Sequence, residues 1–191
     1  MAICTALGLG LALAGCGGGT TPDDVPSTTV EAAADPDPCS LMTGEEMTAI
    51  TTDRVTATRR DGVSCTYRSA PDDGVQVTVR ASGGAKAMEV VHRTTEMLGG
   101  MGGAIADQGG AGADVAGMLK KDMSAAPKLG DEAAWGANDT LSVRKGDGFV
   151  EVTPPLMHDP ANHSGYPLIG KAEKRKIAEA VAAKLLAKLP H

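Results

Sequence analysis

The stretch Val75-Gln76-Val77-Thr78-Val79-Arg80 decides the fold, because valines alternate strictly with polar residues along it. A period of two places the valines on one face of a β-strand and the polar residues on the other. One buried face beside one solvated face is typical of an antiparallel sheet. The sequence therefore predicts that this segment is a strand in such a sheet.

Turn signals divide the neighbouring sequence into further strands. Asp61-Gly62 and Asp72-Asp73-Gly74 precede the valine strand, and Gly146-Asp147-Gly148 marks a hairpin further along. Around these turns we expect strands over residues 55–60, 64–69, 130–137, 141–145 and 149–153.

Apolar residues at helical spacing predict the helices, which we expect at residues 43–50, 85–98 and 171–189, with a weaker one at 114–123. Thr43 and Glu46 have the spacing of a capping box, and Met42 and Met47 have the positions of a hydrophobic staple around it. The pair Gly99-Gly100 is expected to end the middle helix, and residues 99–112 are expected to form a mobile loop.

These elements predict an α+β domain, with an antiparallel sheet of about six strands and helices packed on one face. The order short helix, three strands, long helix occurs twice, in residues 43–98 and 114–189. This order suggests two pseudo-repeated halves, although few residues are identical between them. Two unrelated meanders within one domain are the alternative.

The N-terminus resembles the signal peptide of a bacterial lipoprotein. Residues 3–14 form an uncharged, mostly apolar run that ends in Leu13-Ala14-Gly15-Cys16, similar to a lipobox, although no Lys or Arg precedes the run. A buried N-terminal helix is the alternative. We expect a signal peptide over 1–15, a lipidated Cys16 with a disordered tether over 16–37, and a single extracytoplasmic domain over 38–191.

Four cysteines reduce to one candidate pair. Cys4 leaves with the signal peptide and Cys16 carries the lipid, so Cys39 and Cys65 remain. Outside the cytoplasm such a pair favours a structural disulfide. A metal site or a catalytic thiol is the alternative, but the chain has no Cys-x-x-Cys motif.

Three motifs together resemble an uncharacterised family of actinobacterial lipoproteins. Pro38-Cys39-Ser40-Leu41-Met42-Thr43 is similar to the family's Pro-Cys-Ser-Leu-Leu-Thr motif. Cys65-Thr66-Tyr67 matches a cysteine two residues before an aromatic, and Gly130-Asp131-Glu132-Ala133-Ala134-Trp135 is similar to a Gly-Asp-Glu-Ala-Tyr/Trp segment. Met42, an inserted Ala134 and the glycine-rich loop depart from the pattern. The resemblance implies an anchor, a disulfide and this architecture, and it carries no catalytic residue.

Charge and composition exclude some ligand classes. The net charge of −6 argues against nucleic acid, whose phosphates require clustered Lys and Arg. Aromatic residues make up 2% of the chain, which disfavours base stacking and sugar binding. We therefore expect a non-catalytic binding or interaction module without a cofactor. It would be anchored in the cell membrane on the extracytoplasmic face, with a cell-envelope protein or a small molecule as its partner.

Two other functions are alternatives to this hypothesis. Thioether and imidazole ligands suit copper, which makes a metal-handling lipoprotein the first alternative, with candidate ligands His92, Met97, Met101, His158 and His163. The loop histidines are expected to be solvent-exposed. A small extracellular hydrolase is the second alternative, although the common nucleophile and metalloprotease motifs are absent from the sequence.

Overall fold

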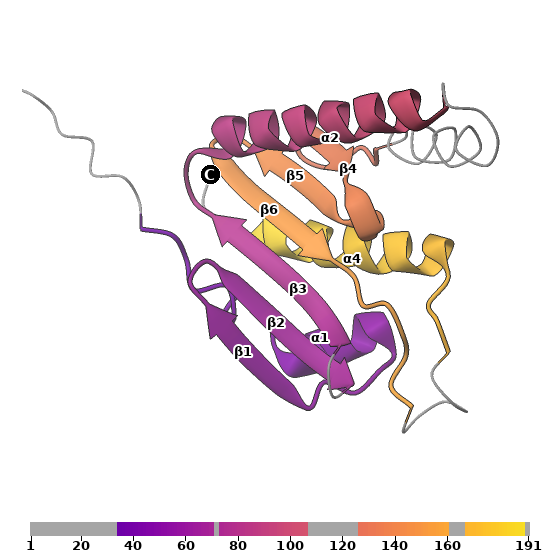
Figure 1. The fold of residues 1–191 in the computed structure, drawn as a ribbon. Helices are drawn as coiled ribbons and strands as arrows, with labels where there is room; N and C mark the ends of the chain where they lie inside the picture. Colours follow the sequence, from indigo (N-terminus) through magenta and orange to yellow (C-terminus); the bar gives the residue numbers. More distant parts are fainter. Residues whose placement is uncertain (1–33, 71–72, 107–125, 161–166, 190–191) are drawn as a thin grey trace, which may run out of the picture. The chain divides into compact units, whose positions relative to one another are not determined.

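A computed structural model of the chain describes residues 34–70, 73–106, 126–160 and 167–189, and all statements below concern this part. It contains one six-stranded antiparallel sheet with the strand order β1-β2-β3-β6-β5-β4 (Figure 1). The strands are β1 Ala57–Asp61, β2 Ser64–Ala70, β3 Asp73–Arg80, β4 Glu132–Trp135, β5 Leu141–Lys145 and β6 Gly148–Thr153. The helices are α1 Gly44–Thr51, α2 Gly84–Ala106 and α4 Lys171–Lys188, with a short 3-10 helix at Ala137–Asp139.

Two three-stranded meanders meet at the centre of this sheet. Strand β3 pairs with β6 in the register Val77↔Val152 and Val79↔Val150. The valines of β3 are therefore buried beside those of β6, as the alternating pattern predicts. The α+β class and the antiparallel sheet of six strands are confirmed.

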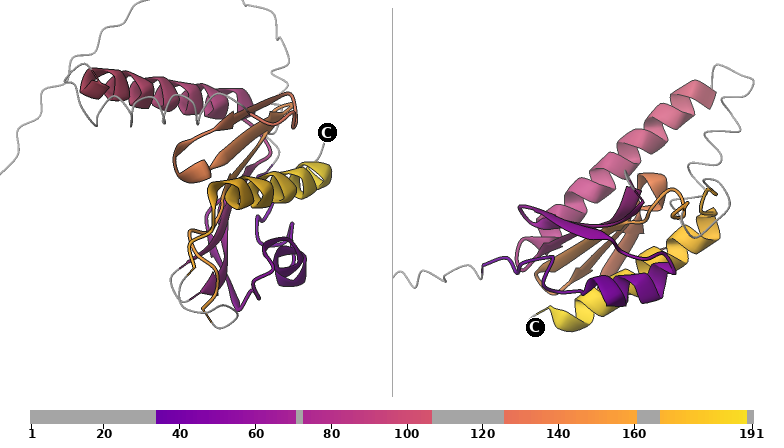
Figure 2. Two further views of the ribbon diagram at one scale, coloured as in Figure 1. Left: turned by 90° about the vertical axis from the view of Figure 1, so that its right-hand side faces the viewer. Right: turned by 90° about the horizontal axis from the view of Figure 1, so that it is seen from below.

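The main core lies between the sheet and two helices, α1 and α4. Helix α4 contributes Ile177, Val181 and Leu185, each no more than 3% exposed, and α1 contributes Met47. In the left view of Figure 2 both helices lie on the same side of the sheet. The recurrence of these apolar residues every four positions explains why this side of α4 is buried.

Helix α2 lies on the other face of the sheet. Its Met88 packs against Phe149 and Ala134 in a separate small cluster. Phe149 and Val150 are neighbours on β6, so their side chains point to opposite faces and both faces of this strand are apolar. The prediction that helices pack on one face therefore holds for α1 and α4, while α2 covers the opposite face.

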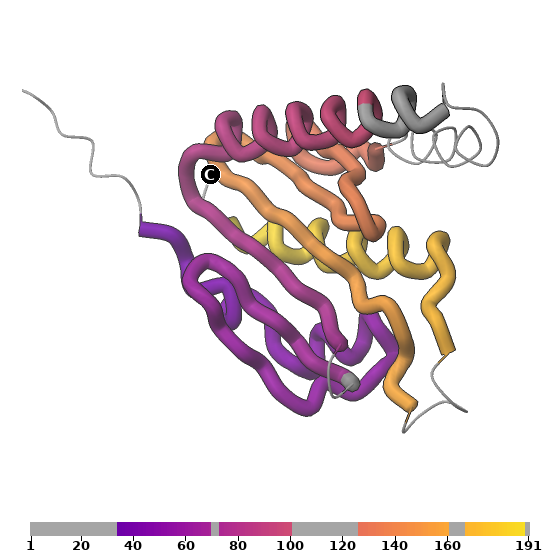
Figure 3. Tube along the Cα trace, viewed as in Figure 1, coloured from indigo at the N-terminus to yellow at the C-terminus, as the bar shows by residue number. Residues whose placement is uncertain are grey.

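The strand order agrees with two repeated halves, but the helices do not follow the repeat. Exchanging the first meander with the second leaves the order β1-β2-β3-β6-β5-β4 unchanged (Figure 3). A twofold axis between antiparallel β3 and β6 would run perpendicular to the sheet and would place α2 and α4 on the same face. They lie on opposite faces, so the symmetry is limited to the sheet. The helix expected at 114–123 lies outside the described residues.

Local signals set most element ends. The capping box of α1 is present, with the Glu46 amide donating to Thr43 Oγ1 and the Thr43 amide donating to Glu46 Oε2.

The expectation that Gly99-Gly100 ends the middle helix is wrong, because α2 continues to Ala106. Neither glycine has a positive φ, the conformation with which glycine usually ends a helix. Residues 107–112 of the expected loop lie outside the described part. None of the described helices is long and apolar enough to cross a membrane.

Candidate functional site

The outward face of β1, β2 and β3 is left without a helix over it in the described part of the chain. Helix α2 packs on β5 and β6, and α1 and α4 lie behind the sheet in the view of Figure 1. Half of one sheet face is therefore open, with the flank of α2 rising along its side. This arrangement forms a step between helix and sheet, where a ligand would contact both.

Three neighbouring hollows lie on this face of the sheet, two of them bordered by α2 and the third by β1, β2, β3 and the chain after β6. Their volumes are about 410, 380 and 360 Å³. The first two share Val90, Val91 and Glu151, and the last two share Asn138 and Thr153. We call the three together the groove.

The floor of the groove is polar because the outward positions of the strands are polar. Arg59, Thr66, Gln76 and Thr153 pair in one row across β1, β2, β3 and β6. The charged lining residues comprise four cations and two carboxylates, namely Arg59, Arg68, Arg80, Lys86, Asp73 and Glu151. The groove is thus more basic than the chain as a whole, which carries a net charge of −6.

Both carboxylates of the groove are already hydrogen-bonded within the protein. Asp73 Oδ2 accepts from the amides of Leu156 and Met157 at 2.7 and 2.8 Å, and Glu151 accepts from the Ser142 hydroxyl at 3.1 Å. Asp73 Oδ1 also accepts from the following amide. By contrast, the side chains of Arg59 and Arg80 make no hydrogen bond or ion pair with any described residue. The carboxylate oxygens are therefore occupied by donors of the protein, whereas the guanidinium donors of Arg59 and Arg80 are available to a ligand.

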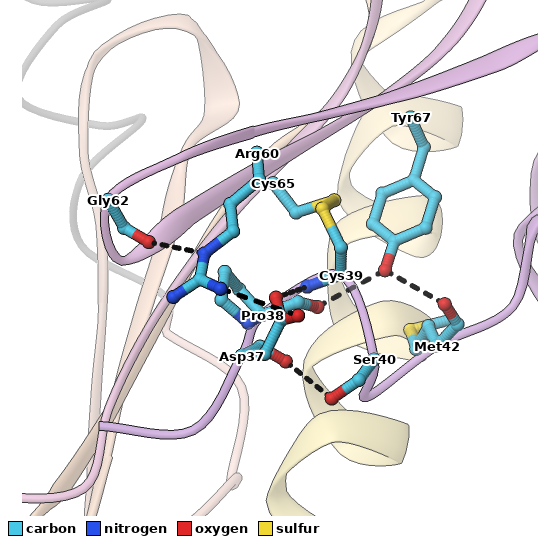
Figure 4. Close-up of a disulfide and its surroundings, with 9 residues drawn as sticks. All are labelled: Asp37, Pro38, Cys39, Ser40, Met42, Arg60, Gly62, Cys65 and Tyr67. Carbon is cyan, nitrogen blue, oxygen red and sulfur yellow. Dashed lines mark hydrogen bonds and ion pairs between the residues drawn. A yellow bond between two sulfur atoms is a disulfide. The ribbon is translucent and has the colours of Figure 1, made fainter. Parts of the chain in front are cut away.

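The predicted disulfide between Cys39 and Cys65 is confirmed, with 5.2 Å between the two Cα atoms. It lies on the side of the sheet away from the groove and joins the segment before α1 to β2 (Figure 4). Arg60, next to Arg59 but on the opposite face of β1, pairs there with Asp37 at 3.5 Å.

Tyr67 reinforces the same junction. Its hydroxyl donates to the carbonyl oxygens of Pro38 and Met42, at 3.2 and 3.0 Å (Figure 4). Burial raises the pKa of Tyr67 to about 12, because the phenolate would be desolvated. The tyrosine therefore stays a neutral donor at physiological pH.

His158 is not solvent-exposed, contrary to the expectation from the sequence. Its side chain is 12% exposed, with Nδ1 2.9 Å from Oδ2 of the fully buried Asp53. Its Nε2 lies 3.6 Å from Glu173 in the first turn of α4. The two carboxylates hold the loop after β6 against α1 and α4. Asp53 and His158 are 105 residues apart, so no local pattern indicates the pairing.

His92 lies on α2, away from His158. Its Nε2 is 2.7 Å from Glu132 Oε1, and Arg144 Nε is 3.2 Å from the other oxygen of the same carboxylate. The hydrogen bond from His92, followed by that from Arg144, lowers the pKa of Glu132 below its usual value. His92 and His158 thus have different partners on opposite faces of the sheet.

The remaining residues named from the sequence are not brought together. Met97 is 60% exposed on α2, the side chain of Met101 is not described, and His163 and Cys16 lie outside the described residues. Within the described ranges, no group of three or more His, Cys, Asp or Glu residues could hold a metal ion.

Comparison with known proteins adds no relative. No family model, curated protein or solved structure matches the chain. A functional proposal therefore depends on the geometry of the groove and of the disulfide.

Proposed function

We propose that this protein is a lipid-anchored, extracytoplasmic binding module that holds its ligand in the groove without catalysis. The observation that supports the proposal is the open polar face of β1–β3 beside α2. Arg59, Arg80 and two hydrogen-bonded carboxylates are among the residues that line this face. Cations without a partner on this face add nothing to the stability of the fold, whereas they would attract an anionic ligand.

The location rests on the sequence together with the disulfide. Leu13-Ala14-Gly15-Cys16 would supply the lipid anchor, and residues 16–37 would supply the tether. The bond between Cys39 and Cys65 supports an oxidising compartment, since disulfides persist outside the cytoplasm. Membership of the uncharacterised actinobacterial lipoprotein family is part of the same proposal.

The residues that line the groove favour binding over the two alternatives. No histidine or cysteine is among the described lining residues, so the candidate copper ligands and the classical hydrolytic bases lie elsewhere. His158 is enclosed by Asp53 and Glu173 behind the sheet. A metal-handling lipoprotein remains the alternative that a metal-dependent rise in melting temperature would favour.

Crosslinking on intact cells tests the proposed function. A photo-crosslinking amino acid at Gln76, which is exposed on the groove floor, is compared with one at Lys176, which is exposed on α4 behind the sheet. We expect a covalent adduct from Gln76, identified by mass spectrometry as a protein or a small molecule, and none of that mass from Lys176. Equal adducts from both positions, or none from Gln76, would contradict a binding role for the groove.

A further inference from the structure

We infer that the 360 Å³ hollow of the groove is an oxyanion site, in which Arg59 and Arg68 hold a carboxylate or phosphate group of the ligand. This inference rests on the proposed function of the groove and names the chemistry of its ligand. A carboxylate probe and a phosphate probe distinguish the two possible sources of the oxyanion.

The two arginines reach this hollow from adjacent strands. Arg59 on β1 pairs with Thr66, which stands two residues before Arg68 on the same face of β2. Both arginines line the hollow together with Gln76, whose side-chain amide adds a further donor. A planar guanidinium presents two parallel N–H groups that match the two oxygens of a carboxylate or phosphate.

Gly74, which lines the hollow, allows β3 to lie close against the backbone of β2. A Cβ at this position would overlap the Tyr67 carbonyl oxygen and would lie 2.8 Å from Arg68 Cα. The close approach follows from the register shift between Arg68 and Ala70, which brings the two backbones together. Because only glycine fits, a side chain at position 74 would displace the β2 backbone that carries Arg68.

Asp73 forms part of the wall, where backbone amides hold its side chain in place. Its carboxylate accepts three backbone hydrogen bonds, from Gly74, Leu156 and Met157, all at 2.7 to 2.8 Å. These amides satisfy its oxygens and hold the chain after β6 against the hollow. The apolar side chains of Pro154 and Leu156 form the remaining wall, and Leu156 is 47% exposed. The site thus suits an anionic group attached to a less polar body.

Titration of the purified full chain in detergent tests the site with two probes, tripolyphosphate for phosphate and tricarballylate for carboxylate. Calorimetry at low ionic strength should detect binding of at least one probe, and binding should weaken at physiological salt. Arg59→Gln should weaken it about tenfold, the loss of one charge-assisted contact. Arg68→Gln should act in the same direction, and the preferred probe identifies the source of the oxyanion.

Arg60→Gln is the matched control, because it removes the same charge from the next residue of β1 on the opposite face. We expect it to change the affinity less than about twofold, because Arg60 points to the opposite face of the sheet, pairs there with Asp37 and does not contact the probe. Equal weakening by Arg59→Gln and Arg60→Gln would mean diffuse attraction and would overturn the site. Failure of both probes to bind would overturn it as well.

The two proposals fail in different ways. If Gln76 crosslinks a partner and neither anion competes, the groove binds a ligand and the oxyanion site is wrong. If the anions bind through Arg59 but no adduct forms on cells, the oxyanion site stands and the proposed cellular role is wrong.

Discussion

Tyr67 joins the segment before α1 to the centre of the sheet through one hydroxyl group. Replacing it by Phe removes the donor that Pro38 and Met42 share and leaves both buried carbonyl oxygens without it. We expect Tyr67→Phe to lower the free energy of unfolding by about 1–2 kcal/mol, as measured by urea denaturation. Unchanged stability with the Cys39–Cys65 bond intact would show that these hydrogen bonds contribute nothing net.

Glu132 makes stability depend on pH in a predictable direction. Its pKa is lowered in the folded state by His92 and Arg144, so the ionised form stabilises the fold. This contribution is fully present above pH ~4.5, the pKa of the unfolded state, and is lost as the pH falls through the lowered folded pKa. Glu132→Gln should therefore cost about 0.5 kcal/mol at neutral pH, a value discounted for the exposed position.

Urea denaturation at neutral and at acidic pH measures the effect of Glu132→Gln. The difference between the variant and the parent should vanish in acid, where both carry an uncharged side chain. Glu89→Gln is a suitable control, because its ion pair with Arg93 is exposed on α2 and should matter less. A difference that persists at low pH would mean that shape, and not charge, is responsible.

Gly84, Gly99 and Gly100 lie in the same helix but differ in the atoms that surround them. A Cβ added at Gly99 or Gly100 would meet no atom within 4 Å, whereas a Cβ at Gly84 would lie 2.6 Å from the Gly148 carbonyl oxygen. The double change Gly99→Ala/Gly100→Ala should therefore stabilise the end of α2 by about 1 kcal/mol, because alanine lowers the entropy lost on helix formation. Hydrogen exchange measures the effect, and we expect the last amides of α2 to exchange more slowly in the variant.

Gly84→Ala is predicted to have the opposite sign. The added methyl group would separate α2 from the β5–β6 turn, where the Gly84 amide donates to the Asp147 carbonyl oxygen at 2.7 Å. We expect a loss of about 1–3 kcal/mol in thermal or urea unfolding. A neutral result would show that the turn can move away without cost.

The elements whose signals are local were predictable from the sequence. The alternation of Val75–Val79 and the glycine hairpin after β5 set the strands, and the capping box set the start of α1. The face that α2 covers was not predictable, because Phe149 and Val150 make both faces of β6 apolar. The groove follows from that placement, and Arg59 lies in a strand without alternation, so its direction could not be read from the pattern.

At the scale of the whole molecule, the anchor prediction concerns Cys16, which lies outside the described residues. If its thiol is acylated, Cys16→Ser should leave an unprocessed or mislocalised precursor, visible as a larger band in cell fractions. A variant that stays in the membrane fraction, is processed at the same position and is labelled by a palmitate analogue would contradict the lipoprotein assignment.

The disulfide should stabilise the domain without being required for its fold. Replacing both Cys39 and Cys65 by Ala should lower the free energy of unfolding by about 3–4 kcal/mol on the chain-entropy account. The core between the sheet and α4 does not depend on the bond, so the circular dichroism spectrum should be retained. Two free thiols in unreduced, secreted protein would contradict the pairing itself.

The same bond determines how mechanical force would enter the domain. A pull on the chain before Cys39 reaches β2 through the sulfur atoms, so α1 and β1 carry no load. The 26-residue separation between the two cysteines corresponds to about 90 Å of extended chain that stays hidden while the bond is intact. In a protein stretched between a membrane and a partner, the strands of the sheet would therefore separate first. The segment between the two cysteines would not extend while the bond is intact. In single-molecule pulling, a reductant should add that hidden length to the unfolding step.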